Sequence, residues 1–198
     1  MDRLILASAS PRRKEICEKL GLSFDVVPAA GEEPLDPARP LADAVLDVAK
    51  AKAREVSARY PGRLVLGADT VVAAPDGTVL GKPRDPADAA RMLSLLSGRA
   101  HTVYTGVTVR RGTFSRTAHE ATQVRFRPLT QSEISAYIAT GEPMDKAGAY
   151  GIQGRGCVLV EGIDGNYHNV VGLPTCLLAG MLRQVGIDVL TGGQEGRP

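Results

Sequence analysis

Strand-like and helix-like patterns of hydrophobic residues alternate along the chain. Residues 3–7 and 64–74 form continuous, largely apolar runs that predict buried strands. Between these runs, residues 41–59 repeat apolar residues at helical spacing, which predicts a long amphipathic helix. The alternation of the two patterns favours α/β layering around a central sheet.

Capping and turn residues limit the other predicted elements. Ser10 and Pro11 begin a helix that Gly21 ends, and the capping box Thr130-x-x-Glu133 begins a helix that reaches Thr140. Further predicted elements are a short strand after the turn at 75–77 that ends at 81–83, a helix at 86–96, hairpin strands at 101–110 and 114–126, a strand at 158–163 and a helix at 174–185. The glycine-rich stretch 141–156 is predicted to be a loop.

Length and charge narrow the class of protein. With 198 residues, no internal repeat and no linker composition, we expect residues 1–190 to form a single α/β domain, followed by a flexible tail at 191–198. The net charge of +2 gives no global field for duplex nucleic acid or an anionic membrane. No apolar run approaches the ~20 residues that span a bilayer. A cytoplasmic location is expected.

The cysteines and histidines suggest no catalytic cluster. Cys17, Cys157 and Cys176 are odd in number and lack a CxxC pair, so neither a disulfide framework nor a thiolate zinc site is predicted. We expect these cysteines to be reduced and to pack in the core. The three histidines are far apart and are expected to be structural or surface residues.

The first candidate site is the cluster from Ser8 to Lys14, at the turn from the first strand to the first helix. A helix N-terminus offers unpaired N–H groups and the positive end of the helix dipole, and arginine matches phosphate oxygens two at a time. The cluster therefore predicts an anion site. The alternative is a capped surface helix with solvated basic side chains.

Asp69 is the second candidate, because it interrupts an apolar strand. A carboxylate there is costly unless it is paired or binds a metal, so a catalytic or metal role is favoured. The neighbouring Thr70 adds a second polar group. The alternative is a structural position at a sheet edge or bulge with access to solvent.

Two lysines and an acidic pair complete the candidates. Lys52 lies on the inward line of its predicted helix, four residues from Val48, although such lysines often extend along their stems into water. Lys82 stands at a strand end. Glu32-Glu33 lies in the loop after the first strand–helix unit, where paired carboxylates can hold Mg²⁺ or can simply be solvated.

Taken in order, these segments resemble the Maf family of nucleotide pyrophosphatases over about residues 4–182. The motifs that carry the resemblance are Ser8-Ala9-Ser10-Pro11-Arg12-Arg13, Glu33, Lys52-Ala53, Gly67-Ala68-Asp69-Thr70-Val71, Gly81-Lys82-Pro83, the loop 145–154 and Val170-Val171-Gly172-Leu173-Pro174. The resemblance implies a mixed central sheet with flanking helices, in two lobes around a deep cleft similar to inosine triphosphate pyrophosphatases. It also implies a homodimer.

The resemblance implies hydrolysis of a nucleoside triphosphate to the monophosphate and pyrophosphate with a divalent cation, Mg²⁺ or Mn²⁺. Its implied catalytic set is Glu33, Lys52, Asp69 and Lys82, with Asp69 as proton acceptor, Glu33 and Asp69 near the metal, and Ser8 and Arg13 on the phosphates. The positions implied to recognise the base carry Arg12, Thr70 and Gln153, which resemble the dTTP/UTP subgroup.

Three alternatives remain at this level. Some relatives are linked to septum formation, so a nucleotide-binding regulator of cell division is the alternative of another class. A pyrophosphatase of the 7-methylguanosine triphosphate type would carry an aromatic residue in place of Arg12. A phosphatase that releases orthophosphate uses similar residue types.

Overall fold

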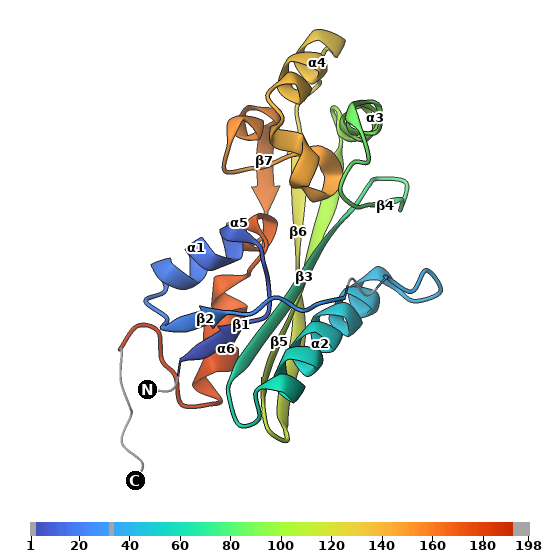
Figure 1. Ribbon diagram of the computed structural model, residues 1–198. Helices are drawn as coiled ribbons and strands as arrows, with labels where there is room; N and C mark the ends of the chain where they lie inside the picture. The colour runs from blue at the N-terminus through green and yellow to red at the C-terminus, as the bar shows by residue number, and fades with distance from the viewer. Residues whose placement is uncertain (1–2, 32–33, 192–198) are drawn as a thin grey trace. The chain divides into compact units, whose positions relative to one another are not determined.

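The computed structural model describes residues 3–31 and 34–191 and has a mixed α/β fold, with helices flanking a central sheet (Figure 1). The strands are β1 (Leu4–Leu6), β2 (Phe24–Val26), β3 (Val65–Ala73), β4 (Val79–Leu80), β5 (Ala100–Arg111), β6 (Phe114–Phe126) and β7 (Val160–Asp164). The α-helices are α1 (Pro11–Lys19), α2 (Leu41–Arg59), α3 (Pro86–Leu96), α4 (Gln131–Ala139), α5 (Tyr167–Val171) and α6 (Thr175–Arg183).

The sheet is mixed in direction. Its strands are hydrogen-bonded in the order β2-β1-β3-β5-β6-β7, and β4 pairs with β3 beside this path. β1 runs parallel to β2 and β3, with Ile5 opposite Asp25 and Val65, whereas the β3–β4 and β6–β7 pairs are antiparallel. The predicted fold class, an α/β protein with a mixed central sheet and flanking helices, is confirmed.

The chain divides into two compact units that are discontinuous in sequence. The first unit comprises Met1–Asp69, Thr105–Glu120 and Gly172–Pro198, and the second comprises Thr70–Tyr104 and Ala121–Val171. The single domain over residues 1–190 and the deep cleft stay predictions. No helix in the described part of the chain is both long and apolar enough to cross a membrane.

Helix α2 packs closely on the sheet in the first unit, because two glycines face it. A Cβ atom at Gly67 would lie 2.6 Å from the carbonyl oxygen of Ala49, and one at Gly106 would lie 2.6 Å from that of Val45. Aliphatic side chains fill the remaining space between β1, β3 and α2; they include Ile5, Ala7, Ala53, Val56 and Val65. The backbone of the helix is therefore nearly in contact with two strands.

The core of the second unit contains an aromatic cluster. His101, Phe126 and Tyr150 make pairwise edge-to-face contacts with ring centroids 4.8–5.3 Å apart. His101 Nε2 lies 2.9 Å from Tyr150 Oη, and burial lowers the pKa of His101 to about 4. This histidine is therefore neutral at pH 7, in agreement with the structural role expected for it.

Most predicted element limits are confirmed. α2 begins at Leu41 and ends at Arg59, and the capping box of α4 has both of its hydrogen bonds, from Glu133 N–H to Thr130 and from Thr130 N–H to Glu133. The hairpin of β5 and β6 turns at Gly112, as its sequence indicated. Apolar periodicity and side-chain capping are local properties, so a sequence pattern can specify both.

Three features differ from the predictions. The stretch 141–156 is not a plain loop, since it contains the 3₁₀ helices η1 (Glu142–Asp145) and η2 (Ala147–Ala149) and the start of η3 (Arg155–Leu159). The short elements β2 and α5 were not predicted, because three to five residues carry too little periodicity. The expectation of core packing holds for Cys17 but is wrong for Cys157 and Cys176, which are exposed.

Candidate active site

The turn between β1 and α1 fixes a buried guanidinium. Arg13 Nη1 donates a hydrogen bond to Ser8 Oγ at 3.0 Å, and Arg13 Nε donates to the Gly172 carbonyl at 2.9 Å. Ser8 and Arg13 are only 8% and 9% exposed. The alternative of solvated basic side chains on a surface helix is therefore wrong for Arg13, although Lys14 is exposed.

The predicted cap of α1 is formed differently from the expectation. Ser10 is the N-cap residue and Pro11 follows as the first helical residue, but the Ser10 side chain makes no capping hydrogen bond. Instead, Ser8 Oγ accepts a bond from the Ser10 N–H at 3.2 Å. Ser8 therefore organises both the chain entering the helix and the guanidinium of Arg13.

The charge of Arg13 is compensated by several groups of the first unit. Burial lowers the pKa of Arg13, whereas the carboxylate of Asp69 acts to raise it. Arginine nevertheless keeps its proton in proteins. The result is a fixed, poorly hydrated cation in electrostatic contact with Asp69, which suits an anionic ligand better than a mobile surface side chain would.

Lys52 and Asp69 form the second part of the site. Lys52 Nζ lies 2.6 Å from Asp69 Oδ1, and each side chain is 20% exposed. Lys52 does not extend into water away from the helix; it turns to the carboxylate from the inward line of α2. On one side of β3, β1 lies opposite Val65 and Leu66 and β4 lies opposite Val72 and Ala73, so Asp69 falls between these two paired stretches. The alternative of a structural position with access to solvent is therefore not excluded by the strand order.

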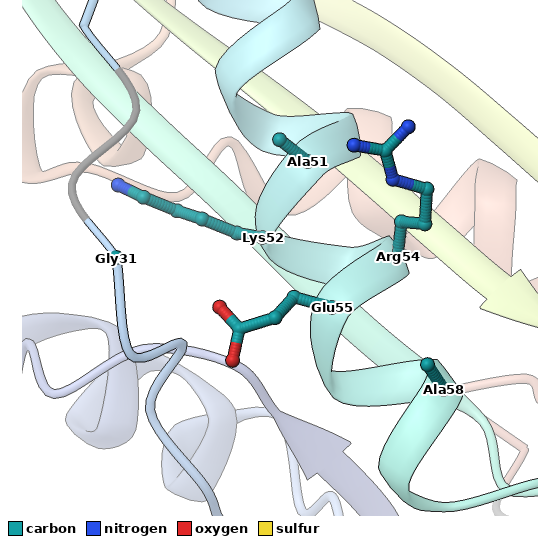
Figure 2. A pocket seen from close by; sticks show the side chains of 6 residues that line it. All are labelled: Gly31, Ala51, Lys52, Arg54, Glu55 and Ala58. Atoms are coloured by element: carbon teal, nitrogen blue, oxygen red, sulfur yellow. The ribbon is translucent and has the colours of Figure 1, made fainter.

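A pocket of about 390 Å³ opens beside Lys52. Its lining comprises Gly31, Ala51, Lys52, Arg54, Glu55 and Ala58. Figure 2 shows Lys52 and Glu55 extending from α2 toward the segment that carries Gly31. Glu55 accepts from the Ala30 N–H at 2.9 Å and pairs with Arg59 at 3.1 Å, so this carboxylate holds the loop against the helix.

The remaining candidates lie elsewhere. Lys82 and Gln153 are exposed residues of the second unit, and Thr70 of the same unit is half-buried. The segments of Lys82 and of the glycine-rich loop are joined by a hydrogen bond from the Gly148 N–H to the Gly81 carbonyl, at 3.0 Å. Arg12 is half-buried on α1. Glu33 lies outside the described residues.

The structure thus brings four candidates of the first unit into one charged cluster, which comprises Ser8, Arg13, Lys52 and Asp69. Sequence analysis missed the partners that hold the candidates in place. The Gly172 carbonyl is 159 residues from Arg13, and only its place in a family motif could have indicated it. Glu55 lies one helical turn after Lys52, and this spacing was the available signal.

The described donors are compatible with a metal ion held chiefly by its substrate. No group of three or more His, Cys, Asp or Glu side chains converges in residues 3–31 and 34–191. Mg²⁺ commonly takes one or two carboxylates and completes its shell with water and phosphate oxygens. Asp69 offers a second oxygen besides the one that faces Lys52, so its carboxylate fits such an ion.

Comparison with known proteins agrees with this arrangement of motifs. A protein from Symbiobacterium thermophilum named dTTP/UTP pyrophosphatase is 54% identical over 98% of this chain and 99% of its own length. A protein of the same name from Moorella thermoacetica is 55% identical over 96% of this chain and 98% of its own. Among solved structures, a HAM1 protein from Coxiella burnetii aligns with 64% of this chain and 73% of its own at 13% identity, with a TM-score of 0.44 that is too low to support an argument.

The family itself follows from a match that covers nearly the whole chain. The model described as Maf-like protein matches residues 3–185, which include every candidate site residue named above. The two relatives extend that agreement to almost full length at more than half identity. This chain belongs to the Maf family.

Proposed function

We propose that this protein is a pyrophosphatase that hydrolyses dTTP and UTP to the nucleoside monophosphate and pyrophosphate. The observation that carries the proposal is the Lys52–Asp69 pair at 2.6 Å, in electrostatic contact with the buried Arg13. A carboxylate fixed among cations combines a proton acceptor with groups that neutralise phosphate charge. The names of the close relatives support the same activity.

In the proposed reaction, Asp69 accepts the proton of a water molecule that attacks the α-phosphorus. The new bond joins the water oxygen to that phosphorus, and the bond from the α-phosphorus to the bridging oxygen of the β-phosphate breaks. Pyrophosphate leaves with the electron pair of the broken bond. Lys52 orients the carboxylate through its contact with Oδ1. The other oxygen has two lone pairs, so it can accept from the water and still face a divalent cation.

The cations stabilise the charge that develops on the leaving pyrophosphate. Arg13 is already held by Ser8 and the Gly172 carbonyl, so little reorganisation is needed when a phosphate binds. Lys82 takes the same role by the family resemblance. Each cation that acts in this way lowers the barrier for departure of the leaving group.

The proposal includes a divalent cation, Mg²⁺ or Mn²⁺. Asp69 would hold it, together with Glu33 from outside the described residues. Such an ion supplies Lewis-acid polarisation of phosphate oxygens and neutralises their charge. The chain's own contribution is to present a fixed carboxylate beside Lys52.

Base selection is assigned to Arg12, Thr70 and Gln153. Uracil and thymine present two carbonyl groups that flank an N–H, and a guanidinium and an amide offer complementary donors and an acceptor. A wrong base would leave polar groups of these side chains unpaired once the bound base covers them, which is an effective means of rejection. A methylated, cationic guanine would instead favour an aromatic partner.

The proposal also places the protein in the cytoplasm as a homodimer. Reduced cysteines without a disulfide framework support the location, since such thiols suit a reducing compartment. The family resemblance supports the homodimer. Sedimentation of the purified protein with and without substrate would measure its oligomeric state.

The test is a panel of dTTP, UTP, CTP, GTP and 7-methylguanosine triphosphate, each with Mg²⁺ and with Mn²⁺. We expect pyrophosphate rather than orthophosphate as product and the highest kcat/KM for dTTP and UTP. Orthophosphate as product would identify a phosphatase instead. A preference for either guanine nucleotide would refute the base assignment, and binding without turnover would indicate a nucleotide-binding regulator.

The variant Arg12→Trp sharpens this test. It removes the guanidinium assigned to the base and supplies an aromatic face, so the kcat/KM ratio of dTTP to 7-methylguanosine triphosphate should fall by about 10-fold or more. Lys14→Ala, two residues further on the same helix, changes an exposed lysine and serves as control. An equal change of the ratio in both variants would exclude a specific role for Arg12.

A further inference from the structure

Two side chains hold the backbone of the loop from Gly151 to Gly156 in the second unit. The N–H of Gly151 donates to Tyr137 Oη at 3.0 Å. The N–H groups of Arg155 and Gly156 donate to the two carboxylate oxygens of Glu142, at 2.8 and 3.1 Å. Three backbone donors of one six-residue loop therefore depend on only two side chains.

Tyr137 and Glu142 act as one unit. The Tyr137 hydroxyl donates to Glu142 Oε1 at 2.8 Å, and the same hydroxyl oxygen accepts from Gly151. Tyr137 belongs to α4 and is buried in the core, whereas Glu142 begins η1. Tyr137 is fixed by the core, and hydrogen bonds from Tyr137 to Glu142 and from the loop backbone to both side chains fix the loop relative to that core.

The carboxylate of Glu142 is kept ionised by these contacts. Burial acts to raise its pKa, but the N–H groups of Gly156 and Arg155, the hydroxyl of Tyr137 and the charge of Lys146 together outweigh burial, so the pKa lies below its ordinary value. Hydrogen bonds to a charged acceptor are stronger than those between neutral groups. Arg155 and Gly156 are therefore held by ionic hydrogen bonds to Glu142, whereas Gly151 is held by the neutral hydroxyl of Tyr137.

The loop also fits closely around the pair. A Cβ atom at Gly154 would lie 2.5 Å from Glu142 Oε2, and one at Gly156 would lie 2.6 Å from Tyr137 Oη. Glycine at these positions lets the chain approach the carboxylate and the hydroxyl directly. These close approaches limit the path of the backbone after Gln153, and the hydrogen bond from the Gly151 N–H to Tyr137 limits it before Gln153.

Gln153 is exposed in this loop, as are Gly154 and Arg155, and it is the loop residue that is assigned to the base. Its predecessor Ile152 packs against the apolar core of the second unit, and its successor Gly154 lies against Glu142. From this geometry we propose that Tyr137 and Glu142 are positioning residues that set the loop 151–156 and, through Gln153, the selectivity for uracil and thymine. The selectivity part rests on the function proposed above, whereas the positioning part does not.

The positioning part is tested by amide hydrogen exchange. Glu142→Gln replaces one acceptor oxygen by an NH₂ group, so the three donors that met two oxygens lose an acceptor. We expect exchange at Arg155 or Gly156 to accelerate by about 10-fold or more relative to wild type. The matched control is Glu133→Gln, which also removes a carboxylate charge of the same unit, on α4, but touches no donor of the loop.

Tyr137→Phe keeps the buried ring and removes the hydroxyl that serves both Glu142 and Gly151. It should accelerate amide exchange at Gly151 by a similar factor, whereas the control Glu133→Gln should leave exchange at Gly151 unchanged. Unchanged protection at all three amides in both variants would overturn the positioning role. This measurement needs no substrate, so it remains decisive even if the wild type hydrolyses none of the nucleotides tested.

Selectivity is tested by a double-mutant cycle. Tyr137→Phe should lower the kcat/KM ratio of dTTP to GTP by about 10-fold, mainly through KM, because a base contact is loosened. In a Gln153→Ala background the same substitution should leave that ratio unchanged. An equal loss in both backgrounds would mean that Tyr137 does not act through Gln153. A wild type without turnover would instead overturn the proposed function.

Discussion

In the first unit, an ion pair fixes Lys52 and Asp69, whereas in the second unit hydrogen bonds from the backbone to Glu142 and Tyr137 fix the loop that carries Gln153. Lys52 meets Asp69 at 2.6 Å from a helix and a strand. The Glu142 carboxylate accepts backbone N–H groups of an irregular loop, and the charge of Lys146 adds to its stabilisation. The comparison separates Lys52 and Asp69, which are assigned to the chemistry and lie on regular elements, from Gln153, which is assigned to the base and lies on an irregular loop.

The largest expected effect is on Asp69, where the first unit is assigned its proton acceptor. Asp69→Asn keeps the size of the side chain but removes its basicity, so kcat should fall by ~10²–10⁴-fold. The ratio of rates with dTTP and GTP should stay constant. The experiment is steady-state kinetics with both nucleotides, with circular dichroism to verify the fold.

Asp25→Asn is the matched control for that experiment. Asp25 is also a strand carboxylate of the first unit and pairs with Arg3 and Arg63, but it is half-buried on β2, apart from Lys52. Its kcat should stay close to wild type. An Asp69→Asn variant that retains more than about a tenth of wild-type kcat, a rate above the range for loss of a general base, would exclude Asp69 as proton acceptor.

The next largest effect is expected for Arg13, and it distinguishes residues that bind the phosphates from residues that select the base. Arg13→Ala should lower kcat/KM by a factor equivalent to about 2–4 kcal/mol, as for the loss of one donor to a transition state. The kcat/KM values for dTTP and for GTP should fall by the same factor, whereas Gln153→Ala should change the ratio of the two values. If Arg13→Ala changes the ratio and Gln153→Ala does not, the phosphate and base roles are assigned to the wrong residues.

The smallest effect is on stability, and it comes from a buried neutral group in the second unit. The pKa of His101 is lowered to about 4 from 6.5, so the unfolded chain binds the extra proton between these values. The contribution of neutral His101 to the free energy of unfolding should therefore be fully present above pH 6.5. The free energy of unfolding should fall by up to about 3 kcal/mol as pH falls to 4. Urea unfolding at several pH values measures this dependence.

His101→Gln should flatten the dependence between pH 6.5 and 4, because the amide has no proton to gain while it can still bond to Tyr150. The exposed His119 of the first unit, changed to Gln, is the control and should leave the slope intact. The carboxylates with lowered pKa values, such as Glu133 at about 2, lose their contribution at lower pH. A slope that survives His101→Gln would show that another group titrates.

The sequence predicted the first unit's site more completely than the second unit's loop. Lys52 and Asp69 interrupt apolar patterns, and a polar residue in such a pattern is visible without a structure. The pairing of Lys52 with Asp69 was not predictable, because periodicity indicates which residues of an element face the core but not which residues they contact there. Glu142 gave no comparable signal, since its partners lie 13 and 14 residues away in an irregular segment.

The same reason explains the errors in the fold. Long elements such as α2 and β6 repeat their pattern often enough to be recognised, while β2 and α5 have three and five residues. Glycine density at 141–156 predicted an irregular chain but not the 3₁₀ turns within it. Those turns depend on contacts with distant residues, such as the hydrogen bond between Gly148 and Gly81.

The near contact between α2 and the sheet has a consequence for how this protein can evolve or be engineered. Replacing glycine by alanine is a common route to thermostability, but at Gly67 the new methyl group would collide with the backbone of the helix. The helix would have to move outward, and Lys52, one turn after Ala49, would move with it. The distance between α2 and the sheet at Gly67 therefore affects both the stability of the fold and the position of Lys52. Stabilising substitutions are better sought at positions that do not contact α2.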